Sequence, residues 1–176
     1  MPADVWETMA VDAAAESSLW RDCLLPESEC DRNPVFSSLG EARHALGLET
    51  IYEGYLVHHG RPRLFAPGDD DTALLLGDYL YAHGVARISA LREVAAVADL
   101  ADLISLCSQL RAEEAEGDGA LWAATAALLG RGELEEARNA LRLHSDPRPL
   151  EAAARSAAGD EAVDAALAAH AGRRPA

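Results

Sequence analysis

The stretch DDDTALLLGDYLYAHGVARISAL, residues 69–91, decides the fold class of this chain. Three aspartates open it, and acidic residues favour a helix start because they complement the positive end of the helix dipole. Behind them the stretch is apolar on nearly every helical face. A helix of this kind must be surrounded by its own fold or by another subunit. The residues that carry the apolar character are Leu74, Leu75, Leu76, Tyr79 and Leu80.

Helical periodicity continues on both sides of this stretch. Ser38 followed by Glu41 is a capping-box signature for the start of a preceding helix. Elsewhere apolar residues recur every three to four positions, and no segment alternates as a strand does. The sequence therefore predicts an all-α fold, a helical bundle. Besides the stretch quoted above, we expect helices over residues 3–25, 38–58, 92–115, 119–129, 133–143 and 149–170.

The charge balance excludes several classes of partner and chemistry. The 176 residues carry a formal net charge of -15, and all 15 basic residues are arginine. A surface this acidic repels phosphate backbones, so we expect no nucleic-acid partner. Without lysine, neither a Schiff base nor a lysine contact to a diphosphate can form.

The cysteines and the apolar runs indicate the compartment. The three cysteines, Cys23, Cys30 and Cys107, include no CxxC pair, which fits a reducing environment. The N-terminal stretch is acidic and lacks the apolar core of a signal peptide. No apolar run approaches the roughly 20 residues that a membrane helix needs. We therefore expect a cytoplasmic protein without stable membrane insertion.

The middle of the chain resembles a known family. ETIYEGYLVH, residues 49–58, and GRPRLFAPGDDDTALLLGDYLYAHGVARI, residues 60–88, are similar to the first half of the trans-isoprenyl (polyprenyl) diphosphate synthases. The resemblance covers roughly residues 39–130 and implies a bundle like the first half of the isoprenoid synthase fold. The positions that match the family pattern are Glu49, Ile51, Leu56, Val57, His58, Gly60, Pro62, Gly68, Leu75, Gly77, Asp78, Leu80 and Ala82.

The departures from that family concern its chemistry. Its first aspartate-rich motif holds the magnesium ions that activate an allylic diphosphate, whereas this chain passes from His58 and His59 directly to Gly60. Asp69, Asp70 and Asp71 lie after the matching proline, and no further carboxylate follows at helical spacing, so we interpret them as helix-start charges. We therefore expect no catalytic residues, no metal and no cofactor, and no enzymatic activity for the chain alone.

What the chain retains is the part that forms the dimer interface in the resembled family. The resemblance thus implies a small-subunit-like, non-catalytic relative that associates through its helix 70–90. The partner would be a catalytic polyprenyl diphosphate synthase or a second copy, and the pair would together set the prenyl chain length. The expected interface residues are Leu74, Leu75, Leu76, Tyr79, Leu80 and His83.

The sequence is also compatible with other functions. ALLGRGELEEARNALR, residues 127–142, resembles half of a TPR-like hairpin, which would suit a helical scaffold or accessory subunit of a larger assembly. A prenyl chain or quinone could bind in an apolar pocket beside Tyr55. A small anion could contact the loop residues His58, His59, Arg61 and Arg63.

The domain organisation that we expect has three parts. Residues 1–36 form an N-terminal helix and connection, residues 37–130 form the isoprenoid-synthase-like helical core, and residues 131–176 form short C-terminal helices.

Overall fold

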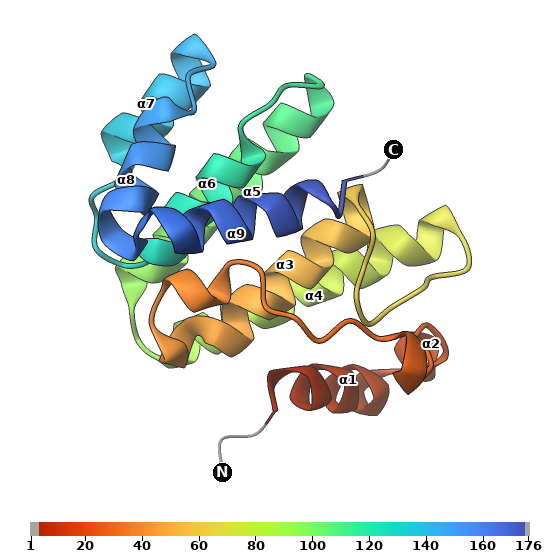
Figure 1. Ribbon diagram of the computed structural model, residues 1–176. Helices are drawn as coiled ribbons and strands as arrows, with labels where there is room; N and C mark the ends of the chain where they lie inside the picture. The colour runs from red at the N-terminus through yellow and green to blue at the C-terminus, as the bar shows by residue number, and fades with distance from the viewer. Residues whose placement is uncertain (1–3, 175–176) are drawn as a thin grey trace.

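A computed structural model describes residues 4–174, and it confirms the all-α fold (Figure 1). Within these residues the only β pairing is an isolated bridge between Leu24 and Phe65. Three short 3-10 helices, Glu27–Glu29, Ser37–Leu39 and Ala42–His44, lie in the connections. The α-helices are α1 (Val5–Glu16), α2 (Ser18–Asp22), α3 (Ala45–His59), α4 (Asp70–Ala90), α5 (Val94–Ala112), α6 (Asp118–Ala127), α7 (Glu135–His144), α8 (Arg148–Ala158) and α9 (Asp160–Ala171).

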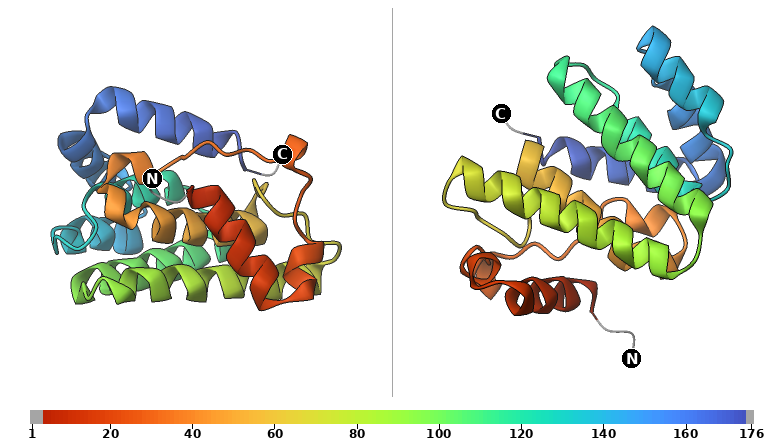
Figure 2. Two further views of the ribbon diagram at one scale, coloured as in Figure 1. Left: turned by 90° about the horizontal axis from the view of Figure 1, so that it is seen from below. Right: turned by 180° about the vertical axis from the view of Figure 1, so that it is seen from behind.

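Helices α3 and α4 pack side by side along most of their length (Figures 1 and 2). Glycines on both helices allow this approach. A Cβ atom at Gly54 would lie 3.0 Å from the carbonyl oxygen of Gly77, and one at Gly84 would lie 2.9 Å from that of Gly47. Because no side chain separates the two backbones at these points, the pair forms a rigid unit at the centre of the fold.

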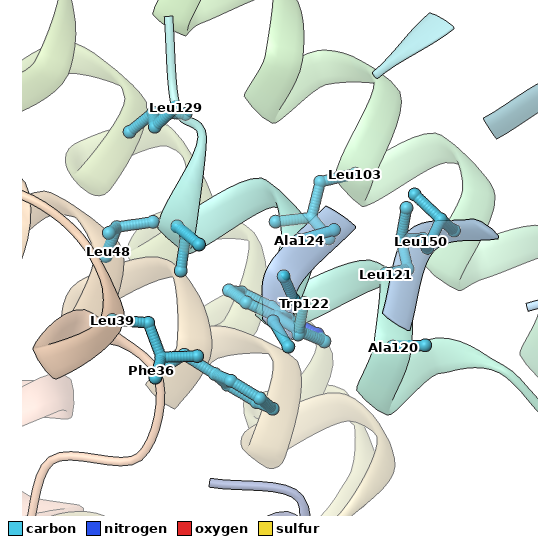
Figure 3. Packing of buried hydrophobic residues seen from close by; sticks show 14 of the residues in the cluster. Phe36, Leu39, Leu48, Leu103, Ala120, Leu121, Trp122, Ala124, Leu129 and Leu150 are labelled. Carbon is cyan, nitrogen blue, oxygen red and sulfur yellow. The ribbon is translucent and has the colours of Figure 1, made fainter. Parts of the chain in front are cut away.

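Helix α6 lies in the main hydrophobic core, where almost all of its residues are buried. Trp122 is the largest of them, and its ring packs against Phe36 and Tyr52, with ring centroids 5.7 and 5.0 Å apart. Figure 3 shows Trp122 and Phe36 among the leucines and alanines of this cluster. Helices α8 and α9 pack against α6, so the C-terminal helices belong to the same core as α3.

The N-terminal helices pack on α3 and α4 through a second, smaller cluster. One face of α1 is buried in this cluster, through Trp6, Met9 and Ala13. From α4, Leu76 and Leu80 meet them in the same cluster. The apolar face of α1 therefore covers part of the central pair of helices, α3 and α4.

Several helix boundaries differ from the sequence prediction. The helix predicted over residues 3–25 is divided at Ser17, whose side chain accepts a hydrogen bond from the Leu19 amide at 3.1 Å and so starts α2; residue 3 lies outside the described residues. Gly159, with a φ of 89°, divides the helix predicted over 149–170. Ser38 lies in a 3-10 turn, and α3 begins at Ala45 without a side-chain cap, so the predicted capping box does not form.

The predicted start of α4 is confirmed. The Asp69 side chain accepts a hydrogen bond from the Thr72 amide at 2.8 Å, which makes Asp69 the N-cap, while Asp70 and Asp71 occupy the first turn. None of the described helices combines the length and the apolarity that crossing a bilayer requires.

Candidate functional site

The residues predicted to form an interface on α4 divide between two environments. Leu74 and Leu75 are each 56% exposed, and Asp71, Asp78 and Ala82 are exposed on the same side of the helix. Leu75 therefore lies between acidic residues one helical turn away on each side. This outward face, which we call the α4 face, consists of Asp71, Leu74, Leu75, Asp78 and Ala82.

The other predicted interface residues point into the chain's own fold. Leu76 and Leu80 are fully buried against α1, which corrects the expectation that they face a partner. Tyr79 is half-buried and stacks on Trp20 at a centroid distance of 5.7 Å. His83 is half-buried, with its Nε2 atom 3.6 Å from Asp12. The N-terminal helices thus provide much of the cover that the apolar pattern requires.

Arg63 lies at the centre of a buried charge cluster that sequence reasoning missed. Its Nη1 atom donates to Glu49 at 2.6 Å and its Nε atom to Glu53 at 3.0 Å. The guanidinium also lies 4.6 Å from the Trp6 ring centroid and 5.0 Å from that of Tyr52. Arg63 is only 1% exposed and its charge is neutralised within the fold, so the expected role in binding an anion is wrong for this residue.

The remaining residues of the predicted anion site do not converge either. His58 lies 3.3 Å from Asp78 across the α3–α4 packing, and burial lowers the pKa of its imidazole despite that carboxylate. His59 packs against Tyr55 with ring centroids 5.3 Å apart. Arg61 instead reaches α9, where its guanidinium donates to the carbonyl of Gly172. The structure therefore separates this set: Arg61 lines a cleft beside α9, whereas His58 lines a different recess with Val57 and Leu74.

Tyr55 belongs to a buried hydrogen-bond network. It is 2% exposed and its hydroxyl donates to Asp118. His170 of α9 lies between that carboxylate and α3, with Nε2 3.0 Å from Asp118 Oδ2 and Nδ1 2.8 Å from the Tyr52 hydroxyl. The Tyr55 ring packs against Tyr52, Trp122 and His170. These contacts fill its surroundings, which corrects the expectation of a prenyl pocket beside it.

The network at Asp118 joins residues of four helices, α3, α5, α6 and α9. Burial alone would raise the pKa of Asp118, but hydrogen bonds from His170 and Tyr55, together with the charge of Arg111, lower it well below its usual range. The anionic carboxylate thus accepts several hydrogen bonds in a largely dry site, a strong arrangement. Nothing in the local sequence marks Asp118 or His170 as partners, because 52 residues separate them.

Neither buried cluster is arranged as a metal centre. Among residues 4–174, no three His, Cys, Asp or Glu side chains gather closely enough to hold a metal ion. No family model, curated protein or solved structure matches the chain. The resemblance to the polyprenyl diphosphate synthases therefore stays a prediction from sequence.

Proposed function

We propose that this chain is a non-catalytic, polyprenyl-diphosphate-synthase-like subunit that associates with a catalytic synthase through the α4 face. The observation that carries the proposal is the exposure of Leu74 and Leu75, 56% each, on an ordered helix that the sequence resemblance assigns to the interface. Removing both exposed portions from water would contribute on the order of 2–3 kcal/mol to association.

The support beneath this face favours a binding role. α4 is held against α3 by the close backbone approaches at Gly54 and Gly84, and against α1 by Leu76 and Leu80. A surface fixed in this way loses little conformational entropy when a partner docks, so a modest apolar area can bind effectively.

The charges beside the leucines favour a different protein over a second copy. Asp71 and Asp78 flank Leu75, and the whole chain carries a net charge of -15. Two copies meeting through this face would bring carboxylates close to carboxylates, which opposes association. A catalytic synthase with basic residues around an apolar recess would be complementary to it.

The expected consequence is control of product length. Alone, the chain would not condense isopentenyl diphosphate with an allylic diphosphate. In the complex, its helices would close one side of the space into which the growing prenyl chain extends. The length of the product would then change when the subunit is added to the catalytic partner.

Co-expression with the catalytic polyprenyl diphosphate synthases encoded in the same genome tests this proposal. Native mass spectrometry should detect a complex, and the product profile should differ from that of the synthase alone. The double variant Leu74→Ser, Leu75→Ser should weaken the complex at least about tenfold while leaving the circular dichroism spectrum unchanged.

Val94→Ser is a matched control, since Val94 is also exposed and apolar but lies at the start of α5. It should bind as the wild type does. A chain that forms no complex with any of these synthases, or that assembles only with itself, would contradict the proposal. Equal effects of the α4 and α5 substitutions would show that the α4 face is not the docking surface.

A further inference from the structure

A cleft lies where the end of α9 meets the turn after α3. Figure 1 shows these two segments beside each other, far apart in sequence but adjacent in space. The backbone amide of Arg61 donates to the carbonyl of Arg173 at 2.9 Å, which joins them. The third wall is the connection between α2 and α3, at Asp31, Asn33, Pro34 and Val35. The cleft has a volume of about 610 Å³, within the range of small-molecule sites.

One side of this cleft is polar and carries two guanidinium groups. Arg173 forms an ion pair with Asp31, and Arg61 donates to the Gly172 carbonyl. Asn33 is fixed beside them, because its side-chain amide donates to Asp31 at 2.6 Å. Each guanidinium has five N–H donors, so these contacts leave further donors for a ligand.

The charges that line the cleft sum to a positive value. Arg61 and Arg173 are cationic and Asp31 is the single carboxylate among the lining residues, whereas the chain as a whole carries -15. The Arg173 side chain is only 20% exposed, so its guanidinium has lost part of its hydration. An additional anion there would recover some of that lost stabilisation.

The other side of the cleft is apolar. Its lining residues are Pro34, Val35, Pro62, Ala168 and Ala169. None of them supplies a side-chain hydrogen bond, and all are small or rigid. The two sides together suit a ligand with an anionic head and a short hydrocarbon body.

We propose that this cleft binds a small amphiphilic oxyanion, with its phosphate or carboxylate head between Arg61 and Arg173 and its apolar body against Val35 and Ala169. The inference is independent of the α4 face and of any partner. It replaces the loop site expected from sequence with one in which Arg61 is retained and Arg173 of α9 supplies the second cation.

Isothermal titration of the purified chain with hexyl phosphate tests the proposal. Saturable one-to-one binding is expected, with a Kd below about 1 mM. Hexanoate should bind if a carboxylate suffices, and only hexyl phosphate should bind if the doubly charged head is required. Hexanol and inorganic phosphate should each bind at least about tenfold more weakly than the best ligand, since each supplies one half of the recognition.

Substitutions locate the site. Arg61→Gln and Arg173→Gln should each weaken binding at least about tenfold, whereas Arg131→Gln, which removes an exposed arginine from the turn before α7, should not. Thermal unfolding monitors whether each variant is folded. Lack of saturable binding by either amphiphile, binding of hexanol as strong as that of the anions, or identical affinities of all three variants would each overturn the proposal.

Discussion

Glu53 and Arg63 are joined twice, once through the side chain and once through the backbone. Glu53 Oε2 accepts from the Arg63 Nε atom at 3.0 Å, and Oε1 accepts from the Arg63 backbone amide at 2.7 Å. Oε1 also accepts from the Leu64 amide at 2.8 Å. One carboxylate of α3 therefore binds the turn that leads to α4 and places its cation in the core.

Removal of the Arg63 side chain should destabilise the fold strongly. Arg63→Ala would leave Glu49 and Glu53 buried without their counter-ion, a change that costs about 3–5 kcal/mol in unfolding free energy. Urea denaturation followed by circular dichroism measures it. Arg131→Ala serves as the control and should lie within about 0.5 kcal/mol of the wild type. A loss below about 1 kcal/mol for Arg63→Ala would refute the assigned role of the cluster.

Acid should destabilise the protein partly through Asp118. Its pKa is lower in the folded chain than the ordinary value near 3.9, so the folded state binds fewer protons than the unfolded state below about pH 4. The stabilisation is present above that pH and is lost as the pH falls toward the folded pKa. Asp118→Asn should therefore show a flatter dependence of unfolding free energy on pH in that range.

Glu133→Gln, an exposed carboxylate in the turn before α7, is the comparison for this titration and should retain the wild-type slope. Urea denaturation at several pH values provides the data. The same slope for Asp118→Asn and the wild type would mean that Asp118 does not carry the acid sensitivity.

Contact between α3 and α4 should be sensitive to a single methyl group. In Gly84→Ala the new Cβ atom would lie 2.9 Å from the Gly47 carbonyl oxygen and even closer to Ile51. Overlap of this kind costs about 1–3 kcal/mol and should outweigh the roughly 1 kcal/mol by which alanine favours a helix. Gly68→Ala, where no atom lies within 4 Å of the new Cβ, is the matched control. Thermal unfolding that places Gly84→Ala at or above the wild type would contradict the packing described.

The fold class could be predicted from local sequence patterns, whereas the environments of the candidate site residues could not. Asp69 at the head of an apolar run marked the start of α4 correctly, because capping depends on residues three positions apart. Leu74, Leu75, Leu76 and Leu80 all looked alike in sequence. The tertiary positions of α1, of α3 and of the turn after α3 determine that two of them are buried and two are exposed.

The charged residues were harder to place for the same reason. Arg63 sits in a loop sequence with Pro62, which is typical of an exposed segment, yet the turn folds back on α3 and carries the side chain inward. His170 reaches Tyr52 across 118 positions of the chain. Such pairings depend on tertiary packing, and no spacing rule within one helix indicates them.

The position of α9 has a consequence for synthesis of the chain. Its His170 packs against Phe36, with ring centroids 5.4 Å apart, and hydrogen-bonds to α3 and α6. Until residues 160–171 have been synthesised, His170 cannot pack on Phe36 or hydrogen-bond to Tyr52 and Asp118, so the aromatic cluster lacks these contacts. The native packing of this cluster therefore cannot be completed before α9 has left the ribosomal exit tunnel.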